Sequence, residues 1–398
     1  MTHGARKRSE PSRYEVIDEG FVVRGPLAAC SRVAVVDEQE LVCTYVTRSA
    51  AGIADYTVEL ARSADGGRSW APQGPVWPDL VGQASMSMAL SRAPSGHLLL
   101  YGTSTPVGAP GESWWDGERQ ALKQNDLVWA HSSDGGRRWT RPRVIPMPIP
   151  GSAEAPGPLT VTGRGRWIAV YAPYNTFDPA VDVDRNQIVA VFSDDHGRTW
   201  RHTSMLRFAD ANGGGAESWV VELADGRLVG TCWNMSLVTG VDEPIPFGIS
   251  HDGGETWSAT RSTGIAGQAT SLAPLADGRL LLAYNQRAQP DPGVWLAVTS
   301  PTDDDFGVGR HGPAWVAERA THSDGDSGHD AWTDFAFGEP SVTVLPGGDV
   351  LVTLWCDQPS GRGIRFVRLA AGSVHGSPGA SIASAISSAM SSANPARP

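Results

Sequence analysis

The chain is predicted to fold as an all-β, six-bladed β-propeller. Three observations lead to this prediction: a turn sequence that recurs four times, a strand pattern that recurs six times, and a composition rich in turn formers. The 398 residues include 46 glycines, 29 prolines and 15 tryptophans, and 40% of them are hydrophobic. This composition is typical of a globular protein with many turns, and the regular recurrence indicates repeated units of a few short strands.

The recurring turn has the form Ser-x-Asp-x-Gly-x-x-Trp. It occupies the segments Ser63–Trp70, Ser132–Trp139, Ser193–Trp200 and Ser250–Trp257. Within each copy, the aspartate accepts hydrogen bonds from the backbone of its own turn, the glycine supplies a positive φ, and the tryptophan packs on neighbouring strands. We therefore interpret all four copies as structural clasps that close a β-hairpin.

The strand pattern sets the number of units at six. Each unit has a strand introduced by a turn residue, at Glu40–Tyr45, Gly96–Tyr101, Gly165–Tyr171, Gly226–Cys232, Gly278–Tyr284 and Gly348–Trp355. An innermost strand precedes each of these, at Arg32–Val36, Ala84–Leu90, Pro158–Thr162, Ser218–Leu223, Thr270–Leu275 and Ser341–Leu345. Units five and six lack a clean clasp, and Ser300–Gly307 is interpreted as a degenerate copy. Six units of this kind form a closed propeller.

The domain boundaries follow from composition. We expect a disordered N-terminus over residues 1–14, one propeller over residues 15–371, and a flexible tail rich in serine and alanine over residues 372–398. Length alone would suggest two or three domains, but a propeller uses about 350 residues as a single domain. The four cysteines, Cys30, Cys43, Cys232 and Cys356, lie in or beside apolar strands without CxxC spacing, so buried thiols are expected.

Charge and composition exclude several partners. The net charge of −11 and the absence of a Lys/Arg block argue against nucleic acid. No apolar segment near the N-terminus has the length of a secretory signal or a membrane span, so we expect a cytoplasmic protein with no membrane partner. The loop 321–330 carries Asp324, Asp326 and Asp330, but loops of this composition are more often plain turns than calcium sites. Neither a metal nor a cofactor is expected.

Polar residues stand just ahead of the innermost strands, on the face opposite the clasped turns. These residues are Arg32, Gln83, Glu154, Glu217, Gln268 and Glu339. Because they hold equivalent positions in successive units, they are expected to ring the mouth of the central channel. A concave site with convergent polar groups is the default hypothesis for a ligand site, although each position taken alone has an ordinary structural explanation.

The loops between the second and third strands extend the same face. They supply Arg48 and Asp55 in the first unit, Trp115 in the second, Trp233 in the fourth and Arg287 in the fifth. Tryptophan rings stack on the apolar faces of sugar rings, while nearby polar groups bind the hydroxyls. This combination predicts a carbohydrate as the ligand.

The repeated turn resembles the Asp box of the sialidase superfamily. The resemblance extends over Glu15 to Leu369 and is strongest in Glu217–Leu228 and Gln268–Leu282. It implies a six-bladed propeller of the sialidase type. It also implies a site with a tyrosine nucleophile, a glutamate that polarises it, an aspartate acid/base and three arginines that clamp the substrate carboxylate.

Three residues are similar to members of that catalytic set. Asp55 resembles the acid/base, Glu217 the glutamate, and Arg32 the first arginine. The expected second arginine is replaced by Trp233, and the third by Trp295 with only Arg287 nearby. Ahead of the last innermost strand, Glu339-Pro340-Ser341 stands where the tyrosine is expected.

These departures favour a glycosidase that is not an ordinary sialidase. Because a carboxylated sugar without its arginine clamp would leave a charge unpaired in a partly dry pocket, we expect an exo-acting glycosidase with Asp55 as acid/base and Glu217 or Glu339 as nucleophile or base. Three alternatives remain open. They are a sialidase whose clamp is rebuilt from Arg32, Arg48 and Arg287, a noncatalytic carbohydrate-binding propeller, and a polysaccharide lyase that would use a base such as His329.

Overall fold

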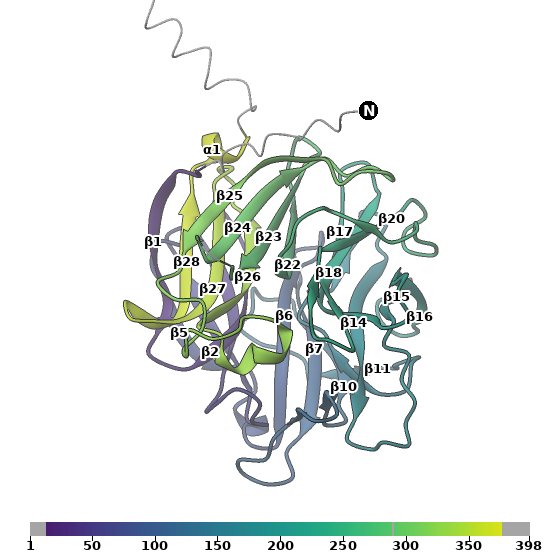
Figure 1. The fold of residues 1–398 in the computed structure, drawn as a ribbon. Helices are drawn as coiled ribbons and strands as arrows, with labels where there is room; N and C mark the ends of the chain where they lie inside the picture. Colours follow the sequence, from purple (N-terminus) through teal and green to yellow (C-terminus); the bar gives the residue numbers. More distant parts are fainter. Residues whose placement is uncertain (1–12, 289, 376–398) are drawn as a thin grey trace, which may run out of the picture.

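The computed structural model describes residues 13–288 and 290–375, and the chain in these ranges is almost entirely β-strand. Within them the strands form six sheets arranged side by side (Figure 1). The expected all-β class and the propeller arrangement are confirmed.

Each of the first three sheets begins with an innermost strand and runs outward. The first contains β2 (Ala28–Val35), β3 (Leu41–Thr47), β4 (Thr57–Ser63) and β5 (Ala71–Pro75). The second contains β6 (Ala84–Arg92), β7 (Leu98–Pro106), β10 (Asp126–Ser132) and β11 (Arg143–Ile145). The third contains β12 (Ser152–Glu154), β13 (Thr160–Val161), β14 (Trp167–Thr176), β15 (Gln187–Ser193) and β16 (Arg201–Arg207). Two short strands extend it: β9 (Ala121–Leu122) pairs with β14, and β8 (Trp115–Asp116) pairs with β9.

The last three sheets repeat the arrangement. The fourth contains β17 (Gly213–Glu222), β18 (Leu228–Ser236), β19 (Asp242–Glu243), β20 (Pro246–Ser250) and β21 (Arg261–Ser262). The fifth contains β22 (Gln268–Pro274), β23 (Leu280–Gln286), β24 (Gly293–Thr299) and β25 (Val308–Val316). The sixth contains β26 (Phe337–Val344), β27 (Val350–Gln358) and β28 (Gly361–Leu369), and its outer strand is β1 (Val16–Arg24) from the other end of the chain. The pairing of β1 with β28 therefore ties the two ends of the chain into one sheet.

The innermost strands are linked into a ring by hydrogen bonds between neighbouring sheets. The bonds run from Ser87 to Cys30, Ser91 to Leu159, Thr160 to Val220, Thr270 to Glu217, Val342 to Ser271, and Thr343 to Val33. Each bond joins one sheet to the next, and the last returns to the first sheet. The ring brings residues far apart in the sequence around one central axis.

The middle strands are buried on both faces because a neighbouring sheet packs on each side of them. In β7, Leu98, Leu99, Leu100 and Tyr101 are all at most 1% exposed. This burial explains why these strands appear in the sequence as continuous apolar runs rather than as alternating patterns.

The clasped turns have the expected geometry. In the first copy, Asp65 accepts hydrogen bonds from the backbone amides of Arg68 and Ser69, and the indole of Trp70 donates to the carbonyl of Gly67. Gly67 has φ of 89°, a conformation that suits glycine. In the degenerate fifth copy, Phe306 is fully buried and packs on Phe247, with ring centroids 5.0 Å apart.

The described chain begins at Arg13, and the ring of Tyr14 is buried with its hydroxyl donating to the carbonyl of Leu296. Folded structure thus starts slightly ahead of the expected boundary at residue 15. At the other end, the short helix α1 (Ala371–His375) buries Val374. Residues 1–12 of the expected disordered N-terminus (1–14) and residues 376–398 of the expected tail (372–398) lie outside the described residues.

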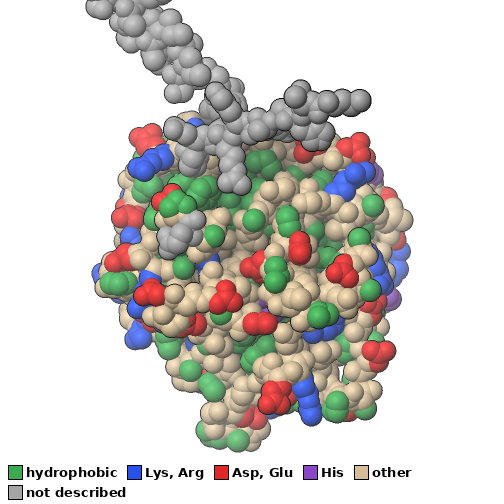
Figure 2. All heavy atoms as spheres, viewed as in Figure 1, with side chains coloured by type: hydrophobic (Ala, Val, Ile, Leu, Met, Phe, Trp, Pro, Cys, Tyr) green, Lys and Arg blue, Asp and Glu red, His purple; other side chains and the backbone are tan. Residues whose placement is uncertain are grey.

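Two 3₁₀ helices, η1 (Pro78–Leu80) and η2 (His329–Asp334), interrupt the loops. None of the helices in the described chain has the length and hydrophobicity needed to cross a membrane. All four cysteines are buried and free, as expected. On the face that Figure 2 shows, acidic and basic side chains are interspersed.

Candidate active site

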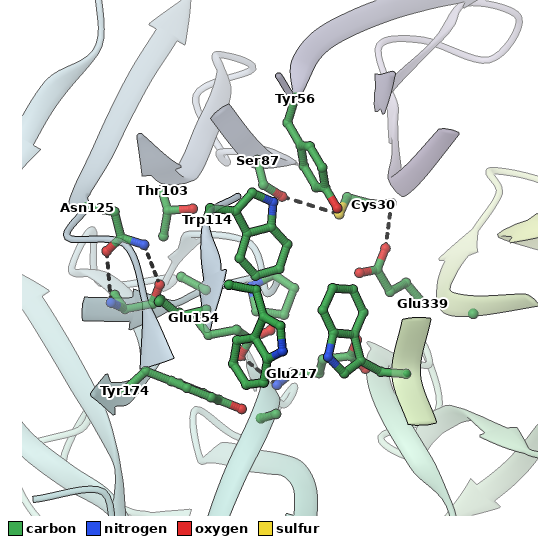
Figure 3. A pocket seen from close by; sticks show the side chains of 18 of the residues that line it. Cys30, Tyr56, Ser87, Thr103, Trp114, Asn125, Glu154, Tyr174, Glu217 and Glu339 are labelled. Atoms are coloured by element: carbon green, nitrogen blue, oxygen red, sulfur yellow. Dashed lines mark hydrogen bonds between the residues drawn. The ribbon is translucent and has the colours of Figure 1, made fainter. Parts of the chain in front are cut away.

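A cavity of about 200 Å³ opens on the central axis at one end of the innermost strands. In the fourth sheet, Glu217 lies at the bulge in the middle of β17, whereas the clasp residue Ser250 lies in register with Leu228, which pairs with Glu222 at the end of β17. The cavity is therefore on the face opposite the clasped turns, as expected. Figure 3 shows Glu154, Glu217 and Glu339 reaching the same space from three different sheets.

A repeated β-bulge aims the residues at this cavity. The register shifts by one residue in β2, β17, β22 and β26, and the residue at each shift has a positive φ: 54° at Cys30, 48° at Glu217, 47° at Ala269 and 47° at Glu339. A positive φ is uncommon for residues other than glycine, and bulges of this kind redirect a side chain beside active sites. Three of these four residues, Cys30, Glu217 and Glu339, line the cavity.

The bulges also supply backbone donors to the neighbouring carboxyl groups. The amide of Cys30 donates to Oε2 of Glu339 at 2.6 Å, and the amide of Glu217 donates to Oε2 of Glu154 at 2.8 Å. Oε2 of Glu217 is buried and has no hydrogen-bond partner among the residues that the structure describes. Of the three glutamates, Glu217 therefore presents a buried oxygen that remains available for a ligand.

Burial shifts the protonation of two of these glutamates. Burial raises the pKa of Glu154 to about 8, and the negative charge of Glu339 adds to this effect. Burial also raises the pKa of Glu217 well above its usual range, followed by the charges of Glu339 and Glu154. Both shifts favour the protonated form of these side chains, which is the form that can donate a proton.

Arg287 is the buried cation of the site. Its terminal nitrogens donate to Oε1 of Gln268 and to the carbonyl of Phe337, and its guanidinium carbon lies 3.6 Å from the ring centroid of Phe335. Burial lowers the pKa of Arg287 to about 9, while the neighbouring Glu217 opposes the shift. Its Nε has no partner among the described residues.

The other two candidate arginines differ from each other. Arg48 lines the cavity and donates to the hydroxyl of Tyr56 at 2.5 Å. Arg32 does not line it: this side chain donates to the carbonyl of Pro156 and lies over the ring of Trp219, 4.9 Å from the centroid. In the alternative in which Arg32, Arg48 and Arg287 form a rebuilt clamp, Arg32 is the member that does not line the cavity; its contacts instead hold the inner ring together.

Seven of the eleven candidate residues line the cavity, namely Arg48, Trp115, Glu154, Glu217, Trp233, Arg287 and Glu339. Besides Arg32, three candidates lie outside the lining. Gln83 is exposed and donates to the carbonyl of Asp79, because β6 has no bulge to turn this position inward. Asp55 accepts hydrogen bonds from the amide of Ser49.

Gln268 lies behind the cavity wall. It donates to Asp242 at 2.5 Å, and Asp242 accepts the indole N–H of Trp233 at 2.7 Å. Since Gln268 also accepts from Arg287, it holds both Trp233 and Arg287 in position. Its place is thus behind the residues that face a ligand.

Several lining residues were not identified from the sequence. They include Tyr56, Trp332, Phe335 and Trp355. A signal was present for Trp355, because it lies near the end of the second strand of its sheet, as Trp233 does. Trp332 and Phe335 follow the acidic loop 321–330 in a segment for which the sequence pattern predicts no strand, so nothing local marks them.

The structure offers no metal site among the residues it describes: no group of three or more His, Cys, Asp or Glu side chains is placed to hold an ion. Asp330 of the acidic loop instead accepts a hydrogen bond from Gln120 at 3.0 Å. His329 is buried beside Trp233, with ring centroids 5.1 Å apart, and burial lowers its pKa.

The fold and its axial cavity define a β-propeller with an acidic, aromatic-walled pocket. The BNR repeat-like domain family matches residues 39–311, which is more than half of the chain. The chain belongs to this family and is an Asp-box protein of the sialidase superfamily.

Solved structures share the fold at low sequence identity. A protein of unknown function from Dyadobacter fermentans matches at TM-score 0.68 and 21% identity, over 89% of this chain and 98% of that one. The NanB sialidase from Streptococcus pneumoniae matches at TM-score 0.57 and 14% identity, over 91% and 71%. An α-L-arabinanase from Penicillium chrysogenum, solved with arabinobiose, matches at 0.60 and 13%, over 90% and 99%. No curated protein sequence matches significantly.

Proposed function

We propose that the protein is an exo-acting glycoside hydrolase built on a six-bladed propeller of the sialidase type, with the six sheets as its blades. The observation that carries the proposal is the convergence of Glu154, Glu217 and Glu339 in one cavity walled by tryptophans. Hydrolysis of a glycosidic bond generally needs two carboxyl groups, one that donates a proton and one that attacks the sugar or activates water. The resemblance in fold to a sialidase and an arabinanase is consistent with this chemistry.

Glu217 is the proposed general acid. Its Oε2 is buried on the cavity wall without a hydrogen-bond partner among the described residues, and burial raises its pKa, which favours the protonated form. Such a carboxyl group is suited to protonate the oxygen of the leaving group. Glu154 is proposed to position Glu217, because its carboxyl group accepts the hydrogen bond of the Glu217 amide.

Glu339 is the proposed nucleophile or base. Its Oε2 accepts the 2.6 Å hydrogen bond of the Cys30 amide, which holds the carboxyl group in position to attack a sugar or to activate water. Asp55, the sequence-based candidate for the acid/base, does not line the cavity, so Glu217 replaces it in this proposal.

The substrate is proposed to be a terminal sugar without a carboxylate. Both terminal nitrogens of Arg287 already donate to protein oxygens, and Arg32 donates to Pro156. Each of these bonds uses one N–H group of its arginine, so fewer donors remain for a bidentate clamp on a carboxylate.

A rearranged sialidase is the second candidate, because Arg48 and Arg287 do line the same cavity. Cleavage of an aryl α-sialoside by the wild-type protein would favour it over the first proposal. Both candidates use the same scaffold and differ in the sugar.

The test is a panel of 4-nitrophenyl glycosides assayed with the wild type and with Glu217→Gln, Glu339→Gln and Asp55→Asn. At least one neutral glycoside is expected to be hydrolysed, with kcat reduced at least about 100-fold in each Gln variant, as for loss of acid/base catalysis. Asp55→Asn is expected to keep kcat within about threefold of wild type. Loss of activity in Asp55→Asn alone would restore Asp55 as the acid, and no turnover of any glycoside would overturn the proposal.

A further inference from the structure

We propose that Trp332, stacked on Trp114, is a specificity-determining residue that restricts the cavity to a single terminal sugar. This inference rests on the proposed glycosidase function and assigns its exo mode to particular side chains. The residues form a roof over the cavity, built by two segments that are distant in the sequence.

The roof consists of Trp114, Trp115 and Trp332, all of which line the cavity. The rings of Trp114 and Trp332 are stacked, with centroids 5.5 Å apart and an interplanar angle of 23°. Trp115 meets Trp332 edge-on, with centroids 5.9 Å apart. Aromatic pairs in these geometries add stability beyond the area they bury, so the roof is a defined structure.

Hydrogen bonds anchor the roof from two sides. The amide of Trp114 donates to the carbonyl of Gly52 at 2.9 Å, and the hydroxyl of Ser113 donates to the same carbonyl at 3.0 Å. Across the cavity mouth, Gln120 donates to Asp330, two residues before Trp332. The loop before β26 is thereby joined to the loop after β7.

The volume of the cavity indicates how many sugar rings it can hold. A cavity of about 200 Å³ is smaller than the roughly 300–1,000 Å³ of sites that hold drug-sized ligands, so it suits one sugar ring and not a chain. Because Trp114 and Trp332 both line the cavity and stack on each other, the pair is expected to exclude further sugars beyond that ring. Removing the Trp332 indole would open this side of the cavity.

The experiment uses the full-length protein and two substrates, both made with the sugar that the wild type hydrolyses. One is the 4-nitrophenyl monosaccharide, and the other is the corresponding 4-nitrophenyl disaccharide. An exo enzyme releases a monosaccharide from the disaccharide substrate first, whereas an opened site releases the intact disaccharide together with nitrophenol. Products are separated by chromatography at early time points.

Wild type, Trp332→Phe and the control Trp295→Ala are expected to release only monosaccharide at first. Trp295 is a partly buried tryptophan outside the cavity lining, so Trp295→Ala makes the same change elsewhere. Trp332→Ala is expected to release intact disaccharide and to raise KM for the monosaccharide substrate about threefold to tenfold, as for a lost ring contact.

Hydrolysis by Trp332→Ala with an unchanged product pattern would overturn the role of Trp332 and leave the proposed function standing. Intact disaccharide released by the wild type itself would also overturn it. Failure of the wild type to hydrolyse any glycoside would instead remove the proposed function and this inference together.

Discussion

The backbone amide of Glu217 donates a 2.8 Å hydrogen bond to Oε2 of Glu154. The two residues are 63 positions apart in the sequence and belong to neighbouring sheets. A bulge with φ of 48° at Glu217 turns this amide toward Glu154, and the same bulge directs the Glu217 side chain to the cavity. One backbone irregularity therefore couples two of the three glutamates.

Glu154 is expected to make the protein less stable at alkaline pH. Its pKa is raised from 4.5 to about 8, so between these values the folded state holds a proton that the unfolded state has lost. This stabilising contribution is fully present below pH 4.5 and is lost as the pH rises through about 8. Urea denaturation between pH 5 and 9 should show the free energy of unfolding falling by a few kcal/mol, at about 1.4 kcal/mol per pKa unit.

The matched variant for that measurement is Glu154→Gln. It keeps the shape and an acceptor for the Glu217 amide but cannot ionise. Its free energy of unfolding should fall less steeply with pH and exceed that of the wild type at pH 9. Equal slopes for the two proteins would contradict the assigned pKa.

The same ionisation is expected to limit activity. Above about pH 8, a negative Glu154 beside Glu217 would hold the proton of Glu217 more tightly, so proton donation slows. We predict that kcat on the hydrolysed aryl glycoside falls above pH 8 in the wild type. In Glu154→Gln the fall should move to higher pH, and an unchanged profile would remove Glu154 from the site's proton chemistry.

Arg287→Met is expected to destabilise the fold by about 2–4 kcal/mol, because it leaves Gln268 and the carbonyl of Phe337 without their buried donor. Urea denaturation measures the change. The control is Arg138→Met: the Arg138 side chain is 90% exposed and pairs with Asp134 at the surface, so its loss should cost at most about 1 kcal/mol. Equal losses in the two variants would contradict the structural role of Arg287.

Asp65→Ala should lower stability by about 1–2 kcal/mol without affecting activity. The carboxylate accepts hydrogen bonds from the amides of Arg68 and Ser69 and from the Ser69 hydroxyl, on the face opposite the cavity. These bonds lower the pKa of Asp65 to about 2, so its stabilising effect is present above pH 3.8 and is lost as the pH falls through about 2. A Tm shift with unchanged kcat supports this role, whereas lost kcat at full stability would contradict it.

The sequence predicted those parts of the molecule that depend on local pattern. The clasped turns and middle strands follow from short-range chemistry, such as the Asp65 turn and the buried run that begins at Leu98. Glu217 and Glu339 could be selected because they precede the apolar runs Ser218–Leu223 and Ser341–Leu345, and both reach the cavity.

The remaining site residues depend on features with no local signal. Whether a residue ahead of an innermost strand points inward depends on a bulge, and β6 has none, so Gln83 stays at the surface while Ser85 and Ser87 line the cavity. Trp332 reaches the site only because its loop crosses to Trp114, a contact between residues 218 positions apart in the numbering. Pairings at such separation are set by tertiary packing.

The central claim is that a glutamate carboxylate in this cavity cleaves a glycosidic bond, and chemical rescue of Glu339→Gly tests it most directly. Glycine accepts the φ of 47° at this position and removes only the side chain. Cleavage of the aryl glycoside should be lost in this variant. Sodium azide should restore cleavage by attacking the sugar in place of the missing carboxylate, which releases the phenol and gives a glycosyl azide. Full activity of Glu339→Gly without azide would contradict the claim.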